Sequence, residues 1–123
     1  MSKTILVVDD SASLRMVVTM ALTGAGYEVI EAEDGEAALR YLDGRKVHLI
    51  ISDVHMPNLD GLGLVRAVKQ LPRYRFMPII MLTTEDQANM IEEGMAMGVK
   101  AWMLKPFQPS QMLAAVGKLV LPF

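Results

Sequence analysis

The sequence contains no cysteine, which excludes disulfide bonds, thiolate metal sites and cysteine-based redox chemistry. It also lacks any apolar run close to the ~18–20 residues that a membrane span requires. The apolar run near the N-terminus is short and ends in two aspartates, which does not match a signal peptide. We therefore expect a cytoplasmic protein without a membrane span.

An excess of positive charge is also missing. The chain carries 12 Lys and Arg residues against 14 Asp and Glu residues, a net charge of −2. No basic patch typical of nucleic-acid binding is visible along the sequence. With 123 residues and no repeat or linker, the chain is predicted to form a single domain over residues 1–123. We expect a monomer that binds no nucleic acid and has no second, DNA-binding domain.

Two kinds of apolar segment alternate along the chain. Short, nearly continuous apolar runs predict strands, and segments with apolar residues three and four positions apart predict helices. The predicted strands cover residues 4–8, 27–32, 47–52, 77–82 and 100–104. The predicted helices cover residues 12–23, 35–42, 62–71 and 85–97, and a last helix begins at Pro109.

This alternation is typical of α/β proteins. Strands that are apolar on both faces belong to parallel sheets covered by helices on both sides. For this length we expect a flavodoxin-like, doubly wound fold with five parallel strands in the order 2-1-3-4-5. Ligands bind such sheets at the carboxyl ends of the strands, near the point where the strand order reverses.

Polar residues stand at the carboxyl ends of four of the five predicted strands. Asp9 and Asp10 follow the first strand, and Asp53 follows the third. Thr83 follows the fourth strand, and Lys105 follows the fifth. Taken singly, such residues are common in turns and helix caps. Because strands 1, 3, 4 and 5 are contiguous in the expected order, their joint placement predicts one functional site.

The residue types of this predicted site indicate phosphoryl chemistry. Three neighbouring carboxylates repel one another unless a cation lies among them, and oxygen ligands of this kind suit Mg²⁺. A carboxylate can attack phosphorus, and Asp53 on the central strand is best placed to do so. Mg²⁺ and the Lys105 ammonium would neutralise charge on the transferred group, while the Thr83 hydroxyl can donate a hydrogen bond to it.

Four groups of residues are informative together: Val7–Asp10, Asp53–Pro57 with Asp60 and Gly61, Leu82–Thr84, and Lys105–Phe107. Through these segments the chain resembles, over its whole length, the receiver domains of bacterial response regulators. In length and layout it is similar to stand-alone chemotaxis regulators of the CheY type.

The resemblance implies roles for the metal-binding and phosphoryl-accepting residues. Asp53 would accept a phosphoryl group from a histidine kinase. Asp10, Asp53 and the backbone carbonyl of His55 would bind Mg²⁺ directly, and Asp9 would assist. The chain would then be a phosphoacceptor with self-catalysed phosphotransfer and autodephosphorylation, not an enzyme.

The resemblance also implies a switch and an output surface. Lys105 and Thr83 would hold the phosphoryl oxygens, and the Lys105–Pro106 bond would be cis. Three residues before the lysine the family usually has Tyr, Phe or His, where this chain has Trp102. We predict that Thr83 and Trp102 form the switch. The target would be a protein such as a flagellar motor component.

Two apolar stripes run along the predicted helix 85–97. The stripe of Met90, Gly94 and Met97 is expected to face the sheet. The second stripe comprises Ala88, Ile91 and Met95. Since one stripe is enough for the core, we predict that the second stripe, bordered by Trp102, binds a partner.

Two alternatives to a signalling switch use the same fold. A phosphate sink would share the chemistry but have no downstream target. A small FMN carrier would need a Ser/Thr/Gly-rich loop after the first strand, whereas residues 9–13 begin with two aspartates that would repel a phosphate. His48, within an apolar strand, is interpreted as structural.

Overall fold

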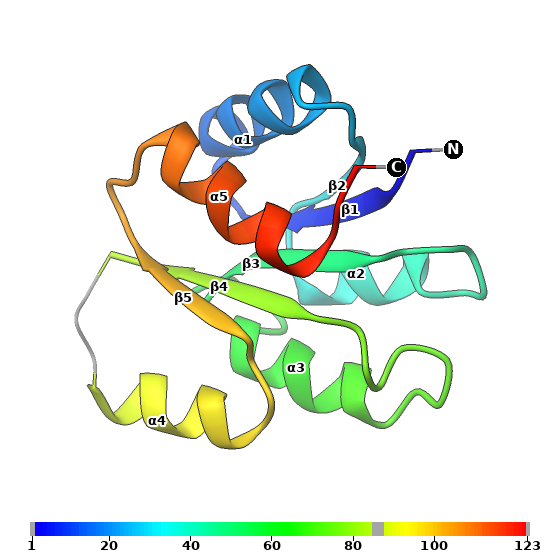
Figure 1. Cartoon of the computed structure of the whole chain (residues 1–123). Coiled ribbons are helices and arrows are strands. Elements are labelled where there is room, and N and C mark those ends of the chain that lie inside the picture. The colour runs from blue at the N-terminus through cyan, green and yellow to red at the C-terminus, as the bar shows by residue number, and fades with distance from the viewer. Residues whose placement is uncertain (1, 85–87, 123) are drawn as a thin grey trace.

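The structure is a computed structural model that describes residues 2–84 and 88–122. Strands and helices alternate along the described chain (Figure 1). The strands are β1 (Thr4–Val8), β2 (Glu28–Ala32), β3 (Leu49–Asp53), β4 (Ile79–Thr83) and β5 (Ala101–Leu104). The helices are α1 (Ala12–Gly24), α2 (Gly35–Tyr41), α3 (Gly61–Lys69), α4 (Ala88–Ala96) and α5 (Pro109–Leu119).

The five strands form one parallel sheet in the order β2-β1-β3-β4-β5, which confirms the predicted topology. Ile5 pairs with Leu49, and Ile50 pairs with Ile79. Every residue of β3 and β4 is buried. These central strands are apolar on both faces because helices cover both sides of the sheet.

Helices α1 and α5 lie on one face of the sheet, and α2, α3 and α4 lie on the other (Figure 1). Successive strand residues point to opposite faces, so each strand contributes side chains to two hydrophobic cores, one on each side of the sheet. Ile51 packs with residues of α1 and α5, whereas Ile50 packs with residues of α2 and α3. Among residues 2–84 and 88–122, no helix has the length and apolar character needed to cross a membrane.

Several predicted strands begin one or two residues too early. The third strand was predicted from Val47, but β3 begins at Leu49. His48 lies just before it and contacts Thr4 twice: its N–H donates to the Thr4 carbonyl at 2.8 Å, and its Nδ1 accepts from the Thr4 N–H at 3.0 Å. These bonds confirm the structural interpretation of His48. The predicted start of the fourth helix, Glu85, lies outside the described residues.

Side-chain caps fix where the helices begin after the strands. The Ser11 hydroxyl accepts from the Leu14 N–H at 3.3 Å and caps α1, so the cap is not Asp10. Asp34 caps α2 and Asp60 caps α3 in the same manner. Each cap satisfies a backbone donor of the first helical turn. The connections at the carboxyl edge of the sheet are therefore held by specific bonds.

Gly61 brings α3 close to the end of β3. A Cβ at this position would overlap the Asp53 carbonyl and the Val54 backbone. The Gly61 N–H donates to the Val54 carbonyl at 2.9 Å. Only glycine permits this approach, which holds the backbone beside Asp53 in place.

Candidate functional site

Three carboxylates meet at the carboxyl edge of the sheet, as predicted. One oxygen each of Asp9, Asp10 and Asp53 lies within 4.8 Å of the others. Asp9 and Asp53 are buried, whereas Asp10 is exposed. The adjacency of β1 and β3 brings these residues together across more than 40 positions of sequence.

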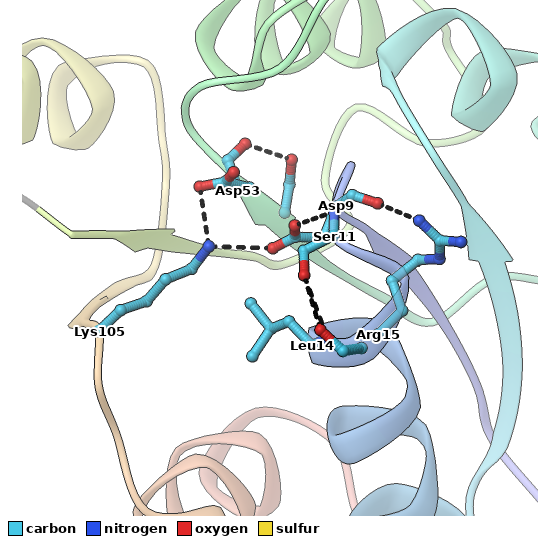
Figure 2. Close-up of polar contacts among 8 residues, drawn as sticks. Asp9, Ser11, Leu14, Arg15, Asp53 and Lys105 are labelled. Carbon is cyan, nitrogen blue, oxygen red and sulfur yellow. Dashed lines mark hydrogen bonds and ion pairs between the residues drawn. The ribbon is translucent and has the colours of Figure 1, made fainter.

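Lys105 joins this cluster from the loop after β5. Its Nζ lies 3.0 Å from Asp9 Oδ2 and 3.3 Å from Asp53 Oδ1, as Figure 2 shows. The Lys105 N–H donates to the Thr83 carbonyl at 2.7 Å, so the end of β4 positions the base of this side chain. The Lys105–Pro106 bond is cis, as the resemblance implied. One ammonium therefore faces two of the three carboxylates.

The first turn of α1 orients Asp9. The Ser11 N–H donates to Asp9 Oδ1 at 2.8 Å, and the Arg15 guanidinium donates to the Asp9 carbonyl. Arg15 also forms an ion pair with Glu31 at 3.2 Å. Figure 2 shows Ser11 and Arg15 beside Asp9, and the sequence predicted neither contact. A serine three residues before Leu14, at the start of an apolar helix, was a recognisable capping signal.

Without a metal ion, the electrostatic environment of Asp53 disfavours its ionised form. Burial, followed by the negative charge of Asp9, raises the pKa of Asp53, while Lys105 opposes this rise. The direction indicates that one ammonium does not fully compensate the cluster. A further cation beside Asp53 would favour its ionised form.

The carboxylate cluster fits a hard divalent cation. Mg²⁺ binds oxygen ligands at about 2.0–2.1 Å and keeps several waters, so two oxygens that bind one ion directly lie at most about 4.2 Å apart. One oxygen each of Asp9, Asp10 and Asp53 lies within 4.8 Å of the others, so a small side-chain shift or a bridging water would let them share one ion. The exposed position of Asp10 leaves solvent access for water ligands. His55, two residues after Asp53, follows in the loop between β3 and α3.

Thr83 ends β4 beside this cluster. Its side chain is buried, and β4 lies between β3 and β5 in the sheet. Asp53 pairs with Leu82, and Thr83 pairs with Leu104. The structure therefore places Thr83 at the same edge as Asp53 and Lys105, as the strand order predicted.

Trp102 is a residue of β5, and its ring lies between this strand and α4. Its indole is half-buried and packs on the α2–α4 side of the sheet. A Cβ at Gly94 of α4 would overlap this ring. The buried Nε1 has no hydrogen-bond partner among the described residues. The ring thus already occupies an inward position against α4.

The two apolar stripes of α4 differ in burial. The first stripe faces the core, as predicted. Gly94 is buried, and Met90 and Met97 pack partly buried against the core. On the second stripe, Met95 is 49% exposed and Ile91 is half-buried. The side chain of Ala88 lies outside the described part of the structure. A partner-binding role for this stripe remains a prediction.

Comparison with known proteins identifies the family. The model of the response regulator receiver domain matches residues 5–117. Chemotaxis protein CheY1 of Helicobacter pylori is 39% identical over 107 residues, which cover 85% of this chain and 86% of that protein. The structure of CheY4 from Vibrio cholerae is 41% identical with a TM-score of 0.92, covering 98% of this chain and 100% of that chain. The chain belongs to the response regulator receiver domain family.

Other relatives are longer than this chain. The alkaline phosphatase synthesis transcriptional regulatory protein PhoP of Bacillus subtilis is 41% identical over 117 residues. The match covers 94% of this chain but 48% of PhoP, so the chain spans about half the length of this relative. The relatives thus define a receiver domain of two-component systems and do not separate a chemotaxis role from a transcriptional one.

Proposed function

We propose that this receiver domain is a phosphorylation-dependent switch with Asp53 as its phosphoacceptor. The observation that carries the proposal is the position of Lys105, whose ammonium contacts both Asp53 and Asp9 within a cluster of three carboxylates. A cation beside a carboxylate on the central strand is what transfer of a dianionic phosphoryl group requires.

The reaction follows from these groups. A carboxylate oxygen of Asp53 attacks the phosphorus of a phosphohistidine on the kinase. The new P–O bond forms as the P–N bond breaks, and the leaving imidazole takes up a proton from solvent water. Lys105 and the Thr83 hydroxyl hold the phosphoryl oxygens. Attack needs the ionised form of Asp53, which the Lys105 ammonium favours against burial and Asp9.

Asp9, Asp10, Asp53 and the backbone carbonyl of His55 would hold Mg²⁺. When bound, the ion supplies positive charge that neutralises the carboxylates and the transferred group. The chain itself keeps Asp9 oriented through the Ser11 N–H. Water later hydrolyses the aspartyl phosphate, so the domain is a self-acting phosphoacceptor and not an enzyme with a separate substrate.

The entry of a phosphodonor has a structural basis beside Lys105. A mainly apolar cavity of about 460 Å³ is lined by Leu14, Val17, Pro106 and Phe107 together with Lys105. Val17 is 49% exposed on α1. An apolar surface of a histidine kinase that covered this cavity would bring its phosphohistidine to the edge that holds Asp53.

The proposed output is protein binding in chemotaxis, at the surface formed by α4, β5 and α5. Support comes from CheY1 and CheY4, whose lengths match this chain. The target would be a protein such as a flagellar motor component, and the domain would act as a cytoplasmic monomer. The exposed Met95 beside half-buried Ile91 favours a target over the alternative of a phosphate sink.

Intact mass spectrometry after incubation with acetyl phosphate and Mg²⁺ tests the phosphoacceptor. The wild type should gain one phosphoryl mass, and Asp53→Asn should not. Asp60→Asn is the matched control, because Asn also caps helices and Asp60 lies in the loop after β3. It should gain the mass like the wild type. If Asp53→Asn gained it as readily, the assignment would be wrong.

A further inference from the structure

A hollow lined by basic side chains lies at the other edge of the sheet from the acidic cluster. The residues just before β4 and β5 gather at this edge because all strands run parallel. A cavity of about 330 Å³ opens between the end of α3, the loop before β4 and the turn from α4 to β5. Its lining consists of Lys69, Arg75, Phe76, Met97, Gly98 and Lys100.

A second hollow continues the first. It measures about 290 Å³, shares Lys69 and Met97 with the first, and adds Arg66 and Gln70. Together the two hollows form a groove between the carboxyl-terminal ends of α3 and α4, which we call the basic groove. A ligand that fills both adjoining hollows is larger than one that fills either alone, which suits a peptide segment.

Of the cations that line the basic groove, Arg66 forms an ion pair with Glu93 at 2.6 Å, whereas the other three form no ion pair among the described residues. None of the ion pairs among the described residues involves Lys69, Arg75 or Lys100. Lys69 Nζ instead donates to the Arg75 carbonyl at 2.9 Å. Partial burial, followed by the charge of Lys100, lowers the pKa of Lys69. Two ammonium groups therefore disfavour each other at this site, and an anion between them would relieve that repulsion.

Apolar surface accompanies these charges. The side chain of Phe76 is 86% exposed, the largest exposure among the large apolar residues described. The Arg75 guanidinium lies 5.2 Å from the centroid of its ring. Met97 contributes apolar surface to both hollows. Cations and apolar groups thus occur together in the groove, so a ligand that matches it offers both carboxylates and apolar side chains.

We propose that the basic groove binds an acidic peptide segment of a protein partner, one that carries both carboxylate and apolar residues. Complementarity of charge selects this occupant, since Lys69, Arg75 and Lys100 gather there without an ion pair among the described residues, on a chain whose net charge is −2. The site lies at the sheet edge away from Asp53. The proposal therefore goes beyond phosphorylation and stands independently of it.

The probe for this site is a fluorescein-labelled peptide of alternating glutamate and leucine, measured by fluorescence anisotropy at low ionic strength. The double variant Arg75→Glu/Lys100→Glu should bind it at least about tenfold more weakly than the wild type. Arg40→Glu/Lys118→Glu is the matched control, because it changes the net charge equally at exposed residues of α2 and α5. This control should retain most of the affinity.

Two further measurements test whether the variant still folds and where the peptide binds. The double variant should keep the melting temperature and Trp102 emission of the wild type, so that lost binding does not reflect lost folding. Amide NMR shifts on adding the peptide should centre on Phe76, Gly98 and Lys100. Equal affinities of the two double variants, shifts centred at Asp9 and Asp53, or binding to anionic phospholipid vesicles but not to the peptide would each overturn the proposal.

Discussion

The three carboxylates of the site differ in whether they contact the Lys105 ammonium. Lys105 contacts Asp9 and Asp53, but no ion pair among the described residues reaches Asp10. Asp10 is also the exposed member of the cluster. Its charge therefore adds repulsion to the metal-free protein and is the part of the cluster most in need of an added cation.

Asp10→Asn should consequently stabilise the metal-free domain. Removing one of three neighbouring charges relieves repulsion on the order of 1 kcal/mol, and the gain should shrink at high salt because Asp10 is exposed. The same change should weaken the stabilisation that Mg²⁺ provides. Thermal unfolding with and without Mg²⁺ measures both effects. A metal-free variant that melts clearly below the wild type would contradict this account.

Gly94 and Trp102 provide a second test at the level of single residues. A glycine within a helix usually costs about 0.5–1 kcal/mol relative to alanine. At Gly94, however, a Cβ would overlap the indole, and overpacking costs about 1–3 kcal/mol. We expect the clash to exceed the gain in helix propensity, so Gly94→Ala should lower stability or displace the ring.

Gly117 in α5 is the control for this substitution. Apart from the neighbouring backbone of α5 itself, no atom lies within 4 Å of a Cβ placed there, so Gly117→Ala should raise the free energy of unfolding. Chemical denaturation of both variants gives the comparison, and Trp102 emission reports whether the ring has moved. Equal stabilisation by both alanines would show that the indole does not restrict position 94.

At the scale of elements, Asp34 links α2 to the loop that follows β3. Its Oδ1 accepts from the Ala37 N–H at 2.8 Å, and its Oδ2 accepts from the Asn58 amide at 2.7 Å. The Gly35 N–H also donates to the Leu59 carbonyl at 3.1 Å. The start of α2 thus supports the loop that carries His55.

This link predicts a pH dependence of stability. The bond from Ala37, followed by that from Asn58, lowers the pKa of Asp34. A lowered folded-state pKa means that the stabilisation is complete above the unfolded value of about 4 and is lost as the pH falls through the folded value. Denaturation of wild type and Asp34→Asn between about pH 6 and 3 should show the wild-type advantage shrinking with acid. An advantage that grew with acid would refute the link.

The elements themselves were predictable because their signals are local or periodic. The buried run of β1 and the proline that begins α5 predict both the element and its position closely. The strand order then brought Asp9, Asp53 and Lys105 together correctly. The start of β3 was predicted too early, at Val47, because an apolar residue next to a strand can be buried without joining the sheet. The Arg15 contact with Asp9 depends on side-chain reach, which no spacing rule encodes.

At the scale of the whole molecule, the parallel sheet separates charges that the net value of −2 conceals. Carboxylates gather at the carboxyl edge, and Lys69, Arg75 and Lys100 gather beyond the other edge. Lys69 and Arg75 lie six positions apart in the sequence, and Lys100, on the turn before β5, joins them only after folding. Composition alone could not have located the basic groove.

The same sheet connects the Asp53 site to the α4 surface. Thr83 ends β4 at the site, and Met81, two residues earlier, pairs with Trp102 on β5. Trp102 in turn packs against Gly94 of α4, with its Nε1 buried and unpartnered among the described residues. The described contacts of the ring are therefore packing contacts with α4 and the core, and none is a hydrogen bond among the described residues. Movement at the end of β4 should therefore alter the indole environment.

Fluorescence tests this connection directly, since Trp102 is the only tryptophan in the chain. Beryllofluoride with Mg²⁺, which mimics a phosphoryl group on Asp53, should draw the Thr83 hydroxyl toward the site and change the Trp102 emission. Thr83→Ala should greatly reduce the change, because it removes the group that responds to the phosphoryl oxygens. The indole already lies against α4, so the signal should report repacking at this contact. An unchanged spectrum at saturating beryllofluoride would make Trp102 a packing residue without a part in the switch.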